Sequence, residues 1–127
     1  MSVDLKHYLG YGIKIDTAYN SEAYNKVENK VDALEEAGYE LAEEHKNNVG
    51  KVRVISDGMC GEFIYIIHVL QETEEEDMYS SKANVAIPLS SYSIESLNEI
   101  KEIAAKILGV NEADVPEIQL HSFYLCT

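Results

Sequence analysis

Residues Glu62–Leu70 read EFIYIIHVL, a run in which almost every side chain is apolar. In an extended strand successive side chains point to opposite faces. The apolar residues would therefore occupy both faces, with Phe63, Tyr65, Ile67 and Val69 on one and Ile64, Ile66 and Leu70 on the other. A strand that is apolar on both faces is typical of the interior of a sheet. We predict that Glu62–Leu70 is the central strand of this fold.

The flanking segments extend this strand into a sheet. Lys51–Ser56 is a short β-prone run, and the Asp57–Gly61 turn joins it to Glu62–Leu70 as a β-hairpin. Near the start, Tyr8–Ile15 alternates in hydropathy and carries two glycines on one face, which predicts another strand. Glu117–Cys126 alternates as well and is predicted to be the last strand, with Ile118, Leu120 and Tyr124 on one face and Gln119, His121, Phe123 and Leu125 on the other.

Two segments have helical periodicity. The first runs from Ser21 to about Asn47, where the Ala37-Gly38 pair marks a kink, a close packing contact or the true helix end. The second is Ile94–Leu108, with Ser93 as N-cap and Gly109 just past its end. Gln71–Ala83 is expected to be an acidic loop.

The element order β-α-β-β-α-β predicts one domain over residues 1–127, of the α+β class. The expected architecture is ferredoxin-like, a four-stranded antiparallel sheet with two helices on one face. The other face would then be apolar with no helix above it. Homodimerisation through that face is the simpler expectation. The alternative is a small-molecule binding or sequestering protein that takes a nucleotide-type ligand on the open sheet face or in the dimer cleft.

The 127 residues include 23 acids and only 10 Lys and Arg, for a net charge of −13. Direct binding to nucleic acid or to an anionic membrane surface is therefore not expected, since both need a basic face. With 46% hydrophobic residues the chain can still form a core. The start lacks the layout of a signal peptide, and the apolar runs are too short to span a membrane. A cytoplasmic protein with its two cysteines reduced is expected.

No arrangement of residues predicts catalysis, metal binding or a cofactor. Cys60 lies in a glycine-flanked turn, but its acidic neighbours Asp57 and Glu62 disfavour a thiolate nucleophile. The four histidines are scattered over different elements and form no His-x-x-x-His pair. A non-enzymatic protein is therefore expected.

The carboxylates instead gather in two clusters. The first acidic cluster lies between Lys30 and Lys46 with no base among its members, which are Asp32, Glu35, Glu36, Glu40, Glu43 and Glu44. The second follows the central strand and contains Glu72, Glu74, Glu75, Glu76 and Asp77. Tyr39 and Tyr79 lie within the clusters, and tyrosine is favoured at contact surfaces.

On a helix, carboxylates four residues apart stand about 6 Å from each other, close to the spacing of phosphates along a nucleic-acid strand. The two clusters therefore predict a surface for a basic macromolecular partner, with salt-sensitive association. The other interpretation is a solvated surface that keeps the protein, or its dimer, in solution.

Two segments add a resemblance. YGIKI (Tyr11–Ile15) and DGMCGEFIYIIHVL (Asp57–Leu70) resemble segments of small acidic bacteriophage accessory proteins of the host-takeover or anti-defence type. The resemblance covers about a fifth of the chain and brings no catalytic residues with it. It implies an inhibitor in the host cytoplasm that occupies the basic, nucleic-acid-binding site of a host nucleic-acid enzyme or defence protein.

Overall fold

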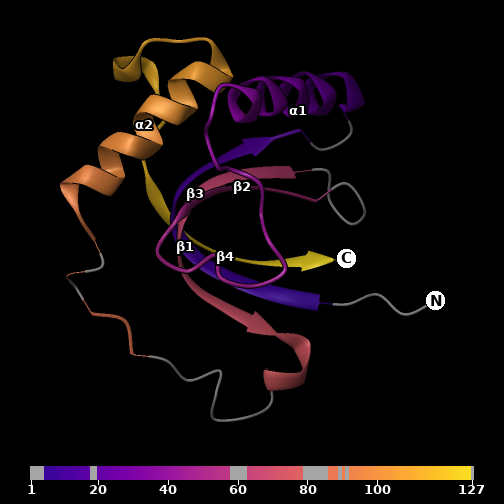
Figure 1. Cartoon of the computed structure of the whole chain (residues 1–127), viewed down its shortest axis with the longest axis vertical. Helices are drawn as coiled ribbons and strands as arrows, with labels where there is room; N and C mark the ends of the chain where they lie inside the picture. Colours follow the sequence, from indigo (N-terminus) through magenta and orange to yellow (C-terminus); the bar gives the residue numbers. More distant parts are fainter. Residues whose placement is uncertain are drawn as a thin grey trace.

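The computed structural model describes residues 5–17, 20–57, 63–78, 86–88, 90 and 92–126. Its elements in chain order are β1 (Leu5–Asp16), α1 (Ser21–Glu36), β2 (Val52–Asp57), β3 (Phe63–Glu74), the 3-10 turn η1 (Glu75–Asp77), α2 (Ile94–Leu108), the 3-10 turn η4 (Glu112–Asp114) and β4 (Gln119–Cys126). The strands form one sheet in the order β2-β3-β1-β4, and every neighbouring pair is antiparallel. Both helices lie on one side of the sheet (Figure 1). The predicted ferredoxin-like α+β arrangement is confirmed.

The central strand lies where its apolar pattern places it, between β1 and β2. It is longer than predicted, because β3 continues to Glu74. Gln71–Glu74 is therefore strand and not loop, and these residues pair with Lys6–Leu9 of β1. Glu72 and Glu74 consequently have fixed places in the sheet, which a mobile loop would not give them.

The sheet is strongly curved, as the long arcs of β1 and β3 show (Figure 1). The register of these strands shifts at Leu9/Gly10, and such an irregularity bends a strand. Gly12 allows a close approach here, since a Cβ on it would lie 1.9 Å from the carbonyl oxygen of Ile66. Because Gly12 has no side chain, the backbones of β1 and β3 can approach each other closely at this position.

The first helix ends eleven residues earlier than the predicted Asn47, at Glu36. Gly38 has φ +107°, a backbone conformation that a helix cannot continue. Leu41, which lies within the predicted helix, instead turns back into the core with 2% of its surface exposed. The α2 prediction is confirmed over Ile94–Leu108, with Ser93 Oγ accepting from Ser96 N–H and Gly109 in the left-handed region.

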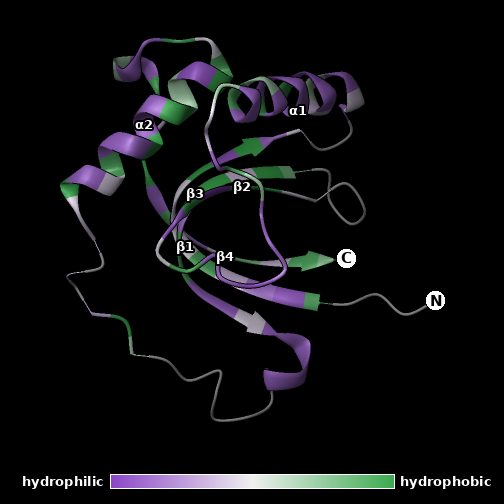
Figure 2. Ribbon diagram, viewed as in Figure 1, coloured by the Kyte–Doolittle hydropathy of each residue, from purple (hydrophilic) through white to green (hydrophobic). Residues whose placement is uncertain are grey.

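Each face of the sheet carries its own hydrophobic core. The helix-side core includes Ile13, Ile64 and Ile66 of the strands with Ile100 and Ile103 of α2. The opposite face carries a second core, made of Tyr8, Ile55, Tyr65, Ile67, Val69, Phe123 and Leu125. All seven are buried. In Figure 2 hydrophobic colour marks parts of the strands, whereas the start of β1 and the end of β3 are hydrophilic.

The expected exposed apolar face is therefore wrong. No helix of the described residues covers it, but the curved sheet closes around its own side chains there. The rings of Tyr65 and Phe123 stack with centroids 3.8 Å apart, which joins β3 to β4 across β1. Residues 37–51, here called the crossing segment, start on the helix side, where Leu41 joins the helix-side core, and pass the edge of β2 to the second face, where Glu43 and His45 meet Tyr8 and Lys6 (Figure 1).

The predicted alternation of the last strand is confirmed. Phe123 and Leu125 are buried in the second core, whereas Leu120 and Tyr124 are 57% and 56% exposed. The pairing explains this, because Phe123 lies opposite Tyr8 and shares its face. Neither helix of the described residues is long and apolar enough to cross a membrane.

Candidate functional site: an acidic pocket above a buried lysine

The crossing segment attaches to the sheet at several points. Ala42 forms an isolated parallel bridge with Val54, and the N–H of Val54 donates to the carbonyl of Leu41. Asn48 is fully buried. Its amide donates to the carbonyl of Glu44 and to Glu72 Oε2, at 2.8 and 2.9 Å. The segment is thus fixed to both β2 and β3.

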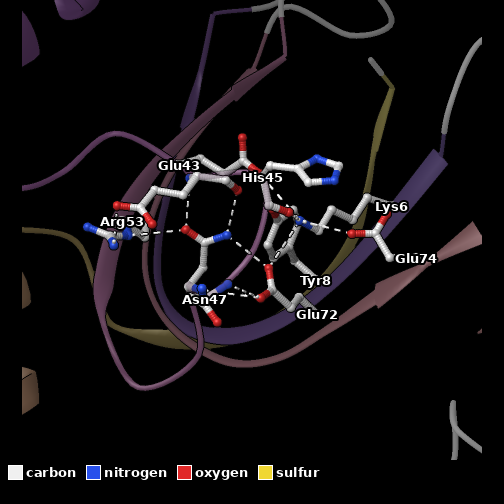
Figure 3. Close-up of polar contacts among 10 residues, drawn as sticks. Lys6, Tyr8, Glu43, His45, Asn47, Arg53, Glu72 and Glu74 are labelled. Atoms are coloured by element: carbon white, nitrogen blue, oxygen red, sulfur yellow. Dashed lines mark hydrogen bonds and ion pairs between the residues drawn. The ribbon is translucent and has the colours of Figure 1, made fainter.

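Lys6 lies at the centre of the polar contacts beneath this segment (Figure 3). Only 6% of its surface is exposed. Its Nζ lies 3.1 Å from Glu72, 3.4 Å from Glu74 and 3.6 Å from Glu43, and it donates to the carbonyl of His45 at 2.5 Å. One buried ammonium therefore joins carboxylates of both acidic clusters. Burial of the lysine without such partners would be strongly unfavourable.

Two further side chains complete this arrangement. The hydroxyl of Tyr8 donates to Glu43, and burial together with that hydrogen bond raises the pKa of Tyr8 far above its usual value. Burial alone would raise the pKa of Glu72, but hydrogen bonds from Asn48 and Lys6 and the lysine charge lower it instead. Tyr8 is thus held protonated and Glu72 ionised.

Arg53 of β2 holds the other end of the crossing segment. It is 2% exposed, and its Nε donates to Asn48 Oδ1 at 3.2 Å while Nη1 donates to the carbonyl of Glu40 at 2.8 Å. Its Nη2 lies 3.5 Å from Glu44 Oε1 and has no hydrogen-bond partner among the described residues. The guanidinium fixes the backbone of the crossing segment and also faces one of its carboxylates.

Above Lys6 the surface is hollowed into a pocket of about 670 Å³. It combines the crossing segment, the start of β1 and the end of β3 with η1, and its lining residues are Leu5, Lys6, Glu43, His45, Lys46, Glu74, Glu75 and Glu76. Figure 2 shows the hydrophilic colour of the end of β3 and of η1 at this place. Four carboxylates thus surround two lysines, of which Lys6 is already engaged with Glu74 and Glu43. We call this hollow the acidic pocket.

The structure divides the first acidic cluster. The predicted array of these carboxylates along one helix face is wrong, because α1 ends at Glu36. Asp32, Glu35 and Glu36 lie on α1. Glu40, Glu43 and Glu44 lie on the crossing segment. Asp32 and Glu35 line a separate hollow of about 280 Å³ beside Glu43. Tyr39 packs on α2, where its hydroxyl donates to Glu102 at 3.1 Å. The first cluster is therefore divided between α1 and the crossing segment.

The second acidic cluster is more compact. Glu72 and Glu74 lie on β3, and Glu75, Glu76 and Asp77 form η1 directly after it. Tyr79 lies outside the described residues. Glu75 and Glu76 are exposed, and Glu75 Oε2 accepts from the N–H of Leu5 at 3.3 Å. These two residues are the exposed carboxylates of the acidic pocket.

Sequence reasoning missed Lys6, Tyr8, Asn48 and Arg53 as site residues. It treated Glu43, Glu44, Glu72 and Glu74 as lacking nearby bases, but Lys6 and Arg53 reach them from β1 and β2. A signal was present for Lys6. The period-2 pattern of the first strand, continued back from Tyr8, places Lys6 on the same face as Tyr8.

Compared with family models, with curated proteins and with solved structures, the chain matches none of them. Over the described residues, no group of three or more His, Cys, Asp or Glu side chains could hold a metal ion. The class that the fold and site define is therefore an α+β, ferredoxin-like domain with an acidic pocket built over a buried lysine.

Proposed function

We propose that this chain is a non-enzymatic binding protein that docks its acidic pocket on a basic surface of a partner protein. The partner class we propose is a host nucleic-acid enzyme or defence protein, whose basic nucleic-acid-binding site the carboxylates occupy in the host cytoplasm. The partner class and its location rest on the resemblance of two segments to phage accessory proteins.

One observation carries this proposal: carboxylates from two acidic clusters, more than thirty positions apart in the sequence, meet at one hollow. Glu43 arrives from the crossing segment, and Glu74, Glu75 and Glu76 arrive from β3 and η1. Glu43 and Glu74 are held by Lys6, whereas Glu75 and Glu76 are exposed at the rim. A rigid floor with charged side chains at its edge suits an arginine or lysine of a partner.

The sharpest test reverses only the exposed carboxylates, because Glu43 and Glu72 support the fold. The variant is Glu75→Lys with Glu76→Lys. The matched control is Glu112→Lys with Asp114→Lys, since both residues are exposed in the second 3-10 turn, η4, and the change in net charge is the same. Wild type and both variants are used to capture partners from a host lysate at several salt concentrations.

We expect the pocket variant to lose a partner that the wild type and the control retain, with an affinity reduced by about tenfold or more. Capture should weaken as salt rises, because screening acts on exposed charges. The captured protein should release labelled duplex DNA when the wild type is added. Equal capture by all three proteins, or capture that does not depend on salt, would contradict the proposal.

The small-ligand alternative gains no support from the described residues. It places a nucleotide-type ligand on the open sheet face or in a dimer cleft, and on the sheet face the second core fills the space with Tyr65, Ile67 and Phe123.

A further inference from the structure

The outer edge of β4 differs from the rest of this acidic surface. β4 is the last strand of the sheet, and no described strand pairs with its outer side. Gln119–Cys126 reads QLHSFYLC and contains no Asp, Glu, Lys or Arg and no proline, in a chain that is 26% charged. Charged residues and proline are the usual protection of a sheet edge against pairing with another chain. This edge lacks both.

The opposite edge of the sheet is protected. There the crossing segment lies against β2 through the Ala42–Val54 bridge, and the N–H of Val54 donates to Leu41. Arg53 adds a hydrogen bond to the carbonyl of Glu40. Pairing through β4 would therefore stop at two copies and would not continue into a filament.

Two of the exposed side chains of β4 are large and apolar. Leu120 and Tyr124 are 57% and 56% exposed, and both lie on the helix-side face of the sheet beyond the reach of the helices. Tyr124 is supported from behind by His7, with ring centroids 5.1 Å apart. Ser122 lies midway between them, and its hydroxyl is 2.7 Å from His7 Nε2.

We propose that β4 pairs antiparallel with β4 of a second copy of this chain, about a twofold axis at Ser122. Residues opposite each other in an antiparallel pair point to the same face of the sheet. Because side chains alternate between the faces along each of two identical strands, the numbers of opposite residues must differ by an even number. With Ser122 opposite itself, Leu120 lies opposite Tyr124 of the second copy, and Tyr124 lies opposite its Leu120. The two exposed apolar side chains of the strand thus cover each other, and the sheet grows from four strands to eight.

Charge favours β4 over other parts of the surface as the site of self-association. Two copies with a net charge of −13 each repel one another. An interface without charged residues adds no close carboxylate pairs to that repulsion. Added salt should therefore tighten this dimer, whereas it weakens docking through the acidic pocket. The two associations respond to salt in opposite directions.

The test measures the mass of the full chain by sedimentation equilibrium over a range of concentrations. The edge variant is Leu120→Glu with Tyr124→Glu. The matched control is Ile94→Glu with Val110→Glu, two exposed apolar residues away from β4, so that the net charge changes equally. Far-UV circular dichroism establishes that all three proteins are folded, and hydrogen exchange follows the β4 amides.

We expect the wild type and the control to approach twice the chain mass of 14.3 kDa with rising concentration. The edge variant should have a dissociation constant larger by about tenfold or more. Protection of the β4 amides should rise with protein concentration in the wild type and in the control, but not in the edge variant. A wild type that stays at the mass of one chain overturns the proposal. So does an edge variant that dimerises like the wild type, or a control that loses the dimer to the same extent.

Discussion

Lys6 of β1 and Glu72 of β3 lie inside the protein with Nζ and Oε2 3.1 Å apart. They are diagonal neighbours in the sheet, because Lys6 pairs with Glu74 and Glu72 pairs with Tyr8. Each also holds the crossing segment: Lys6 donates to the carbonyl of His45, and Glu72 accepts from Asn48. One ion pair therefore couples the register of two strands to the placement of the floor of the acidic pocket.

Replacing Lys6 by methionine should destabilise the protein by about 3 kcal/mol. The side-chain volume is kept, but Glu72, Glu43 and Glu74 lose their shared cation while remaining partly buried. Urea unfolding measures the change. Lys46→Met is the control, because Lys46 lines the same pocket and is exposed. It should change stability by less than about 0.5 kcal/mol, and equal losses in the two variants would contradict the central role of Lys6.

Replacing Asn48 by alanine should cost about 2 kcal/mol or more. Its side chain is fully buried and joins Glu44, Glu72 and Arg53. The variant leaves those groups without their partner and loosens the crossing segment. Hydrogen exchange should show faster exchange at residues 40–50 than in α2. Asn98→Ala, at an exposed position of α2, should leave both measurements near their wild-type values.

Replacing Gly12 by alanine should prevent stable folding or cost more than about 3 kcal/mol. The new Cβ would lie 1.9 Å from the carbonyl oxygen of Ile66 and 2.8 Å from the Cα of Ile67, so backbone has to move. Gly109→Ala provides the comparison. Its φ of +70° costs an alanine about 1 kcal/mol, and the nearest obstacle is the flexible end of Lys30. Thermal unfolding should rank the two in that order, and a Gly12 variant as stable as the wild type would refute the close approach of β1 and β3.

The sequence was sufficient for the fold because its signals are local. The two-faced apolar pattern of β3, the Ser93 cap and the Gly109 end of α2 each depend on neighbours along the chain. The end of α1 was ambiguous, since helical spacing continues through Leu41 while Gly38 breaks it. The tertiary structure decides this, because Leu41 gains more by packing against the helix-side core than by extending a charged helix.

The candidate site could be predicted only in part. The acidic residues are visible in the sequence, and four of them line the acidic pocket. Their cations are not visible, because Lys6 and Arg53 reach them through strand pairing and through a segment of irregular structure. The sheet curvature that buries the second core could not be predicted for the same reason, because it too arises from strand pairing. It depends on a register shift between β1 and β3, which no local pattern specifies.

The stability of the protein should fall in acid in a manner that depends on Glu72. Burial opposes ionisation, but hydrogen bonds from Asn48 and Lys6 lower the pKa of Glu72 below the ordinary 4.5. The unfolded chain therefore binds this proton more readily than the folded one. The stabilisation is fully present above about pH 4.5 and is lost as the pH falls through the lower pKa of the folded state.

Glu72→Gln should accordingly be less stable than the wild type at about pH 7, and the difference should shrink as the pH approaches about 3. Urea unfolding at several pH values measures it. Taking the difference between the two proteins removes the contributions of His7, His68 and His121, whose pKa values are lowered mainly by burial. Glu76→Gln, at an exposed position, should show no such trend. A stability difference for Glu72→Gln that is constant with pH would mean that Glu72 acts through packing alone and not through its charge.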